Sequence, residues 1–167
     1  HAIENRELSV VFQPQFSTEN DKLCGAETLI RWFKPDGTAV SPAEFVPLAE
    51  EHGLVKELDK FAFEQACIMQ TRMKERGLGP IDISVNVSQQ SLYDSKFIEK
   101  YLEIVKANDA DISHIQLEIT ETTLFENNKN FVKMLRKLHK SGFKILMDDF
   151  GTGYSSLMLL KSLPVDF

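Results

Sequence analysis

Long hydrophobic runs are absent from this sequence of 167 residues. No stretch reaches the roughly 18 consecutive apolar residues of a membrane-spanning helix, and the first residues lack the basic and then apolar pattern of a secretion signal. We therefore expect this segment to make no membrane contact. Because the chain starts at His1 rather than at a methionine, we also expect it to be a piece of a longer protein, which could carry an anchor of its own.

Cysteine is scarce. The only two, Cys24 and Cys67, lie far apart and lack the paired spacing of a disulfide framework or a zinc site. This pattern is typical of a protein in a reducing compartment such as the cytoplasm. We expect both cysteines to be small buried apolar side chains.

Basic residues do not dominate the composition either. The chain has 19 Lys and Arg against 25 Asp and Glu, a net charge of −6. Domains that bind nucleic-acid polymers usually present a basic face to the phosphates, so this class of partner is excluded. A small phosphate ligand would need a cation to bring it to such an acidic protein.

What is present is the composition of one globular domain, with 43% hydrophobic and 26% charged residues. Strand-like and helix-like segments alternate along it. The expected strands begin at Leu8, Lys22, Ile81, Ile115 and Phe143. The expected helices run from Pro42 to about His52, from Leu54 to Arg76, from Ser95, from Asn128 to Gly142, and briefly from Ser155.

Capping residues support the first helix. Ser41 can act as the N-cap, Pro42 suits the first helical position, and Glu44 can complete a capping box. Gly53 and Gly77 are the expected ends of the first two helices.

Strands that alternate with helices predict parallel β-α units, in a doubly wound sheet or a barrel. The polar residues favour a barrel, because Asn86, Glu118 and Asp148 all lie near the ends of expected strands and Glu27 lies on a fourth. The carboxyl ends of the strands of a β/α barrel meet at one mouth, where active sites are found. Five strands against the eight of a full barrel predict the first five-eighths of one, with unpaired edges at its first and fifth strands.

Each of these residues also has an ordinary interpretation. A single acidic residue on a strand is usually a solvent-facing charge. Gly151 and Gly153 lack the lysine of a P-loop and the third glycine of a dinucleotide fold, so they are better interpreted as turn residues. The three histidines within the chain are expected on the surface, since none has metal-ligand spacing: His52, His114 and His139.

Six motifs, in order along the chain, resemble those of one family. "AETLIRW" has Glu27, Leu29 and Arg31 of the E-x-L-x-R signature, with Thr28 in place of alanine. The others are "FQPQ", "SPAEFVPLAEEHGL", "SVNVS", "LEITET" and "DDFGTGYSS". The sequence thereby resembles the EAL domains, the bacterial phosphodiesterases of cyclic di-GMP, which adopt a TIM-type (β/α)8 barrel.

The resemblance implies a two-metal site for Mg²⁺ or Mn²⁺ that hydrolyses one phosphodiester bond of cyclic di-GMP to linear pGpG. The residues in metal-ligand positions are Glu27, Asn86, Glu118 and Asp148, with Asp149 at the second ion. Carboxylate and amide oxygens are the hard ligands that these ions prefer, and a cation would offset the repulsion among crowded acids.

Further roles also follow from the resemblance alone. Glu121 matches a glutamate that fixes a regulatory loop, and with Glu27 and Asp149 it is assigned to catalysis. The substrate-binding positions are Gln13, Leu29 and Arg31, and an arginine is suited to bidentate phosphate binding. The regulatory loop, which would couple dimerisation to metal geometry, is Phe150, Gly151, Thr152, Gly153, Tyr154, Ser155 and Ser156.

The resemblance ends where the chain does. Residues 1–167 match the N-terminal portion of an EAL domain, and strands six to eight, with a lysine, a glutamate and a glutamine that complete the site, are absent. We therefore expect little or no turnover from this segment alone, and either association with a second copy or an origin by trimming of an intact barrel. We also expect a fused GGDEF or sensory domain in a parent that could be anchored in the inner membrane. The alternatives left open are a catalytically silent cyclic di-GMP receptor and a dimerisation or scaffold module.

Overall fold

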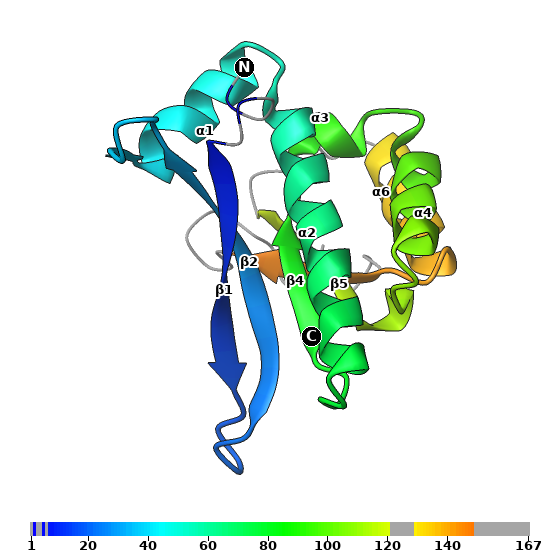
Figure 1. Cartoon of the computed structure of the whole chain (residues 1–167). Coiled ribbons are helices and arrows are strands. Elements are labelled where there is room, and N and C mark those ends of the chain that lie inside the picture. The colour runs from blue at the N-terminus through cyan, green and yellow to red at the C-terminus, as the bar shows by residue number, and fades with distance from the viewer. Residues whose placement is uncertain (1, 3–4, 6, 121–128, 149–167) are drawn as a thin grey trace.

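The computed structural model describes residues 2, 5, 7–120 and 129–148 (Figure 1). Its strands form one sheet in the order β1-β2-β4-β5-β6, with the short β3 paired to β2. The strands are β1 Leu8–Phe16, β2 Leu23–Phe33, β3 Ala39–Val40, β4 Asp82–Asn86, β5 Ile115–Thr120 and β6 Lys144–Asp148. The helices are α1 Pro42–Glu51, α2 Val55–Glu75, α3 Gln89–Leu92, α4 Phe97–Ala107, the 3₁₀ helix η1 Ile112–His114 and α6 Lys129–Lys140.

From β2 onward the expected parallel β-α units are present. β4 pairs in parallel with both β2 and β5, and β5 pairs in parallel with β6. The first pair does not follow this rule, because β1 and β2 form an antiparallel hairpin. The turn from Ser17 to Lys22 closes with a backbone hydrogen bond of 2.9 Å, and a parallel crossover needs about a dozen residues or more.

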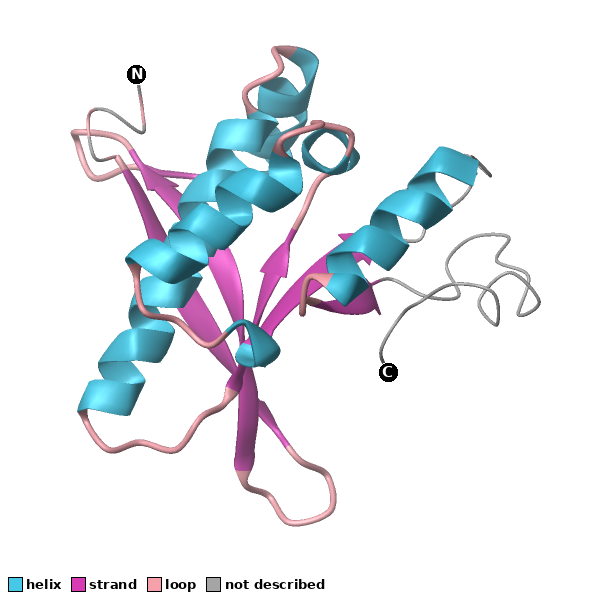
Figure 2. Ribbon diagram, turned by 90° about the vertical axis from the view of Figure 1, so that its right-hand side faces the viewer, coloured by secondary structure: helices cyan, strands magenta, loops and turns pink. Residues whose placement is uncertain are grey.

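The core lies between one face of the sheet and the helices, which Figure 2 shows packed along the strands. On β4 the alternate residues Ile83 and Val85 are fully buried against α2, where Phe63 is also fully buried. A smaller cluster lies beneath α1, where Trp32 meets Phe45 edge-on at 5.7 Å between ring centroids. Because side chains alternate along a strand, the other face of the sheet receives the remaining residues, many of them polar.

The N-cap, the first helical proline and the terminal glycines expected at the helix ends are borne out. Ser41 caps α1 by accepting from the backbone N–H of Ala43, and Pro42 is its first residue. Gly53 and Gly77 follow the ends of α1 and α2 with φ of 69° each, in the left-handed region that favours glycine. In the described part of the chain, no helix is both long and apolar enough to cross a membrane.

The two cysteines differ. Cys67 is fully buried on α2, as expected, and burial raises the pKa of its thiol to about 12. Cys24 is exposed, so the expectation of burial was wrong there. The reason is its place in the hairpin, since β2 gains its second neighbour, β4, only from Gly25 onward.

Candidate active site

The four residues expected at the barrel mouth come together on one face of the sheet. Asn86 and Asp148 are the last residues of β4 and β6, and Asn86 is in register with Glu118 of β5. The amide Nδ2 of Asn86 donates to Oε1 of Glu27 at 2.8 Å, although the two residues are 59 positions apart. The backbone N–H of Val87 also donates to the carbonyl of Glu118 at 2.9 Å.

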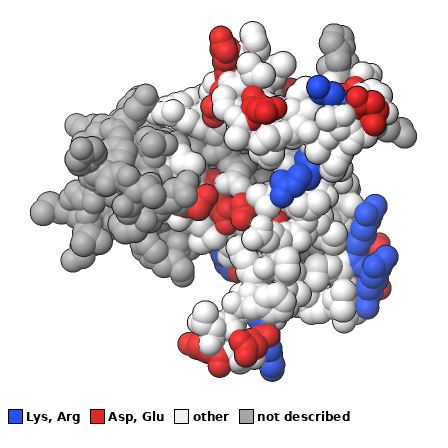
Figure 3. All heavy atoms as spheres, turned by 90° about the vertical axis from the view of Figure 1, so that its left-hand side faces the viewer, with Lys and Arg blue, Asp and Glu red and all other residues white. Residues whose placement is uncertain are grey.

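The acidic residues of this group act on one another electrostatically. Glu118 is only 8% exposed. Burial, together with the negative charges of Glu27 and Asp148, raises the pKa of its carboxyl to about 7. Figure 3 shows acidic side chains gathered in the middle of this face. Such crowding of like charge favours a bound cation or a bound proton.

The donor set fits a hard divalent ion in its chemistry. It offers three carboxylates, and an amide that keeps its carbonyl oxygen for a cation while its nitrogen contacts Glu27. No three His, Cys, Asp or Glu side chains within residues 7–120 and 129–148 are close enough to hold an ion by themselves. The expected ligand Asp149 lies outside the described residues, as do the following positions, for which the structure tests nothing: Glu121, Phe150, Gly151, Thr152, Gly153, Tyr154, Ser155 and Ser156.

A cavity of about 400 Å³ opens beside the acidic group. Leu29 and Arg31 of β2 line it together with Asn86 and Glu118. The guanidinium of Arg31 donates to the carbonyl of Ile30 at 2.9 Å, which leaves most of its N–H groups for a ligand. The cavity therefore places one cation and several acids around the same space.

The third expected substrate residue, Gln13, lies on β1 in register with Glu27. Directly opposite residues of an antiparallel pair share a face, so Gln13 lies beside the acidic group. It is exposed and does not line the cavity.

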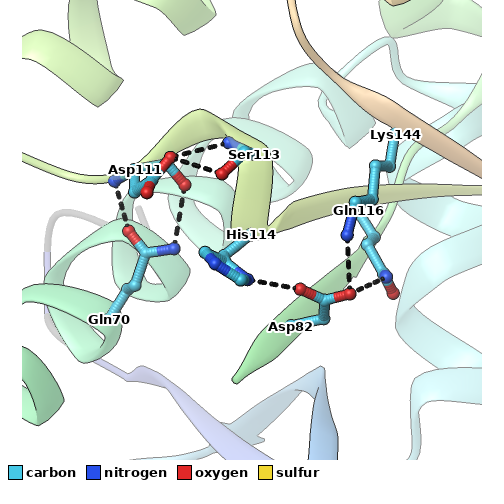
Figure 4. A network of polar contacts seen from close by, with 7 residues as sticks. All are labelled: Gln70, Asp82, Asp111, Ser113, His114, Gln116 and Lys144. Atoms are coloured by element: carbon cyan, nitrogen blue, oxygen red, sulfur yellow. Dashed lines mark hydrogen bonds and ion pairs between the residues drawn. The ribbon is translucent and has the colours of Figure 1, made fainter. Parts of the chain in front are cut away.

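A second polar cluster occupies the opposite, amino ends of the same strands (Figure 4). Asp82 accepts from Gln116 at 2.7 Å and from Lys144 at 2.8 Å, and its other oxygen lies 2.6 Å from Nδ1 of His114. Partial burial opposes the ionisation of Asp82, but these hydrogen bonds outweigh it and lower the pKa of Asp82 below its ordinary value. His114 was wrongly expected to be a plain surface residue; it is half-buried in this cluster.

Sequence reasoning also missed Asp59 of α2, which is 7% exposed and accepts two hydrogen bonds next to Asn86. A signal was present in the sequence. Asp59 follows Leu58 and precedes Ala62 by three positions, so it lies on the apolar stripe of an amphipathic helix. A lone acid in such a stripe has to find donors inside the protein.

Parallel strands that carry acids at their carboxyl ends, beside a lined cavity, define a β/α-barrel protein with an acidic site at the barrel mouth. The more particular assignment comes from the comparison with known proteins. The chain belongs to the EAL domain family, which matches it over residues 1–167.

The relatives include enzymes of cyclic di-GMP. A cyclic di-GMP phosphodiesterase of Pseudomonas aeruginosa is 35% identical over 93% of this chain and 26% of its own length. The bifunctional diguanylate cyclase/cyclic di-GMP phosphodiesterase MucR of the same organism is 32% identical over 98% of this chain and 24% of its own length. The chain thus spans about a quarter of these relatives.

Solved structures agree on the fold. The PaMucR phosphodiesterase in complex with c-di-GMP aligns with a TM-score of 0.92 and 32% identity, over 99% of this chain and 67% of that one. The cGMP-bound EAL enzyme Bd1971 aligns with a TM-score of 0.88 and 27% identity, over 98% of this chain and 46% of that one. The expectation of a partial EAL-type barrel is confirmed.

Proposed function

We propose that this chain is the N-terminal portion of a cyclic di-GMP phosphodiesterase domain, which hydrolyses one phosphodiester bond of cyclic di-GMP to linear pGpG with the help of Mg²⁺ or Mn²⁺. One observation carries the proposal. Asn86 and Glu118, from neighbouring strands, line a cavity that Arg31 also lines, and the Asn86 amide contacts Glu27 on a third strand. The similarity to phosphodiesterases of this family supports the choice of substrate.

The roles follow from the chemistry of each group. Arg31 binds a phosphate of the substrate through its guanidinium fork, and Leu29 contacts the apolar part of the ligand. Gln13 is placed to hydrogen-bond the substrate at the edge of the site, because it lies opposite Glu27. Divalent ions, when bound, lower the pKa of a water molecule and polarise the phosphoryl oxygen.

The acidic group provides the binding site for those ions. Glu27, Asn86, Glu118 and Asp148 are the proposed ligands, and the Asn86 amide holds Glu27 in place through its Nδ2. Asp149 is proposed as a ligand of the second ion, and Glu121 and the loop 150–156 as the parts that regulate it. Arg31 is positively charged and the acids are negatively charged. The site therefore has a phosphate-binding part at Arg31 and a metal-binding part at the acids.

We also propose that the whole protein is longer than this chain. The strands that complete the barrel follow Phe167, a GGDEF or sensory domain is fused to it, and the parent acts in the cytoplasm as a homodimer. The bifunctional relative supports the fusion, since its name joins a diguanylate cyclase to the phosphodiesterase. This chain by itself is proposed to turn over little or no substrate.

The decisive experiment is an assay of the full-length protein with Mg²⁺ and cyclic di-GMP. We expect linear pGpG as the product, and no product after the metal is removed with EDTA. Binding of cyclic di-GMP without hydrolysis would instead make the protein a receptor, and the enzyme proposal would fail. Neither binding nor hydrolysis would leave a scaffold or dimerisation role.

A further inference from the structure

Asp59 is a carboxylate buried on α2 without a neutralising cation. Its Oδ2 accepts from the backbone N–H of Ser88 at 2.8 Å and from Oγ of Ser91 at 2.7 Å. No Lys, Arg or His within the described ranges contacts it, and burial raises the pKa of Asp59 above its ordinary value. A buried acid of this kind is costly, so its two contacts must hold something that the fold or the site requires.

The segment that Asp59 holds follows directly on Asn86. The N–H of Val87 donates to the carbonyl of Glu118, and the next N–H, that of Ser88, donates to Asp59. Two consecutive backbone groups after Asn86 are therefore fixed, one by a neighbouring residue of the site and one by α2. The backbone at Asn86 has little freedom to rotate, and its amide stays directed at Glu27.

Capping of α3 does not account for Asp59. Ser88 is itself the N-cap of α3, and its hydroxyl oxygen accepts from the N–H of Ser91. α3 is tied to α1 as well, since Gln90 donates to the carbonyl of Glu50 at 2.8 Å. Figure 1 shows α3 beside the end of α2 that carries these contacts. Since α3 is already capped, the effect of Asp59 is to fix to α2 the backbone between the end of β4 and α3.

We propose that Asp59 is a positioning residue of the metal site, which acts by anchoring the backbone after Asn86 so that its amide oxygen is presented to a divalent ion. The inference rests on the proposed function, because it needs an ion at Asn86. Residues that orient a metal ligand commonly contribute about 10- to 100-fold to metal affinity.

The test measures Mn²⁺ affinity of the full-length protein by calorimetry, in the wild type and in Asp59→Ala. We expect affinity to fall about tenfold in Asp59→Ala. Asp59→Asn should retain it within about twofold, since both contacts are donated to the single atom Oδ2 and the carbonyl oxygen of the neutral amide can accept them in its place. This rescue would separate the anchoring contact from the charge.

Gln70 provides the matched control (Figure 4). It lies on the same helix, is also 7% exposed, and also holds the backbone of a loop, through its Nε2 to the Asp111 carbonyl at 2.9 Å. That loop leads to the amino end of β5, away from the acidic group. Gln70→Ala should therefore lower the unfolding temperature while leaving Mn²⁺ affinity unchanged.

The outcomes separate the two proposals. If the wild type binds Mn²⁺ and Asp59→Ala binds it equally well, or if Gln70→Ala weakens binding as much, the role of Asp59 is overturned while the proposed function stands. If the wild type binds no Mn²⁺, both fail. Should Asp59→Ala not fold, hydrogen exchange in the wild type gives the answer, because coupling requires Mn²⁺ to slow exchange at the Ser88 amide and not at the Asp111 amide.

Discussion

The acidic residues at the two ends of β4, β5 and β6 lie in opposite electrostatic surroundings. At the carboxyl ends of β4, β5 and β6, Glu118 lies among the like charges of Glu27 and Asp148, and burial raises its pKa to about 7. At the amino ends, Asp82 is surrounded by Lys144, Gln116 and His114, and its pKa is lowered.

Both clusters belong to one face of the sheet. Asp82 and Asn86 are four residues apart on β4, and so are Lys144 and Asp148 on β6, so each pair shares the face that turns away from the helices. At the amino ends the acid has its own donors and needs nothing from outside. At the carboxyl ends Glu118 instead lies among the like charges of Glu27 and Asp148, which favours a cation or a proton from outside.

The largest effect that this comparison predicts is on turnover. Glu27→Ala removes one of the proposed ligands, and we expect hydrolysis of cyclic di-GMP by the full-length protein to fall by more than about 100-fold. The fold should survive, because the change also removes a charge that repels Glu118. Product formation and a thermal melt measure the two quantities, and an unaffected rate would refute Glu27 as a metal ligand.

Alanine substitution of the acid at the amino ends of the strands should instead lower stability and leave turnover nearly unchanged. Asp82→Ala leaves Lys144, Gln116 and His114 without their shared acceptor, so we expect the free energy of unfolding to fall by about 2 kcal/mol. Turnover per folded molecule should stay within about twofold of the wild type. Denaturant unfolding gives the first value.

An exposed ion pair serves as the control for Asp82→Ala. Lys74 and Asp109 lie 3.1 Å apart with side chains 70% and 87% exposed. Lys74→Ala should change the free energy of unfolding by less than about 0.5 kcal/mol, because solvent screens such pairs. An equal loss from both variants would mean that the Asp82 cluster is no more than surface charge.

A smaller effect is expected from Glu118→Gln in the metal-free protein. The pKa of Glu118 is raised on folding, so the unfolded chain loses this proton first and stability falls as the pH rises from about 4 to about 7. The neutral variant should be more stable than the wild type by about 1 kcal/mol at pH 8, after solvent screening, and equal to it near pH 4. Unfolding in EDTA at both pH values tests this, and a difference independent of pH would contradict it.

Local signals in the sequence were sufficient for most of the fold. Ser41, Pro42 and the terminal glycines mark helix ends by their own backbone preferences, so α1 and α2 fall within a residue or so of their expected bounds. The antiparallel first pair was missed because strand direction depends on the length of a connection, here Ser17 to Lys22, rather than on residue type. The four-residue helix α3 is too short for any periodicity to predict.

The candidate site was predictable where it depends on strand ends. Asn86, Glu118 and Asp148 needed only the parallel order of the strands to be brought together. Asp59 and His114 could not be assigned in the same way, because each finds its partners on other elements, about 30 residues away in the sequence. Such contacts depend on how helices and loops pack over the sheet, which no local pattern specifies.

The smallest predicted effect is the stability that the Asp82 cluster loses at low pH. A carboxyl whose pKa is lowered on folding contributes stability above its unfolded pKa of about 4, and that contribution is lost as the pH falls below it. We expect the advantage of the wild type over Asp82→Asn to shrink by less than about 1 kcal/mol between pH 6 and pH 3, since the side chains of Lys144 and His114 are roughly a third exposed. Denaturant unfolding at the two pH values measures it. This dependence has the opposite sign to that of Glu118, so an advantage of the wild type that grew on acidification would show that Asp82 is not held as an anion and would remove the contrast between the two ends of the sheet.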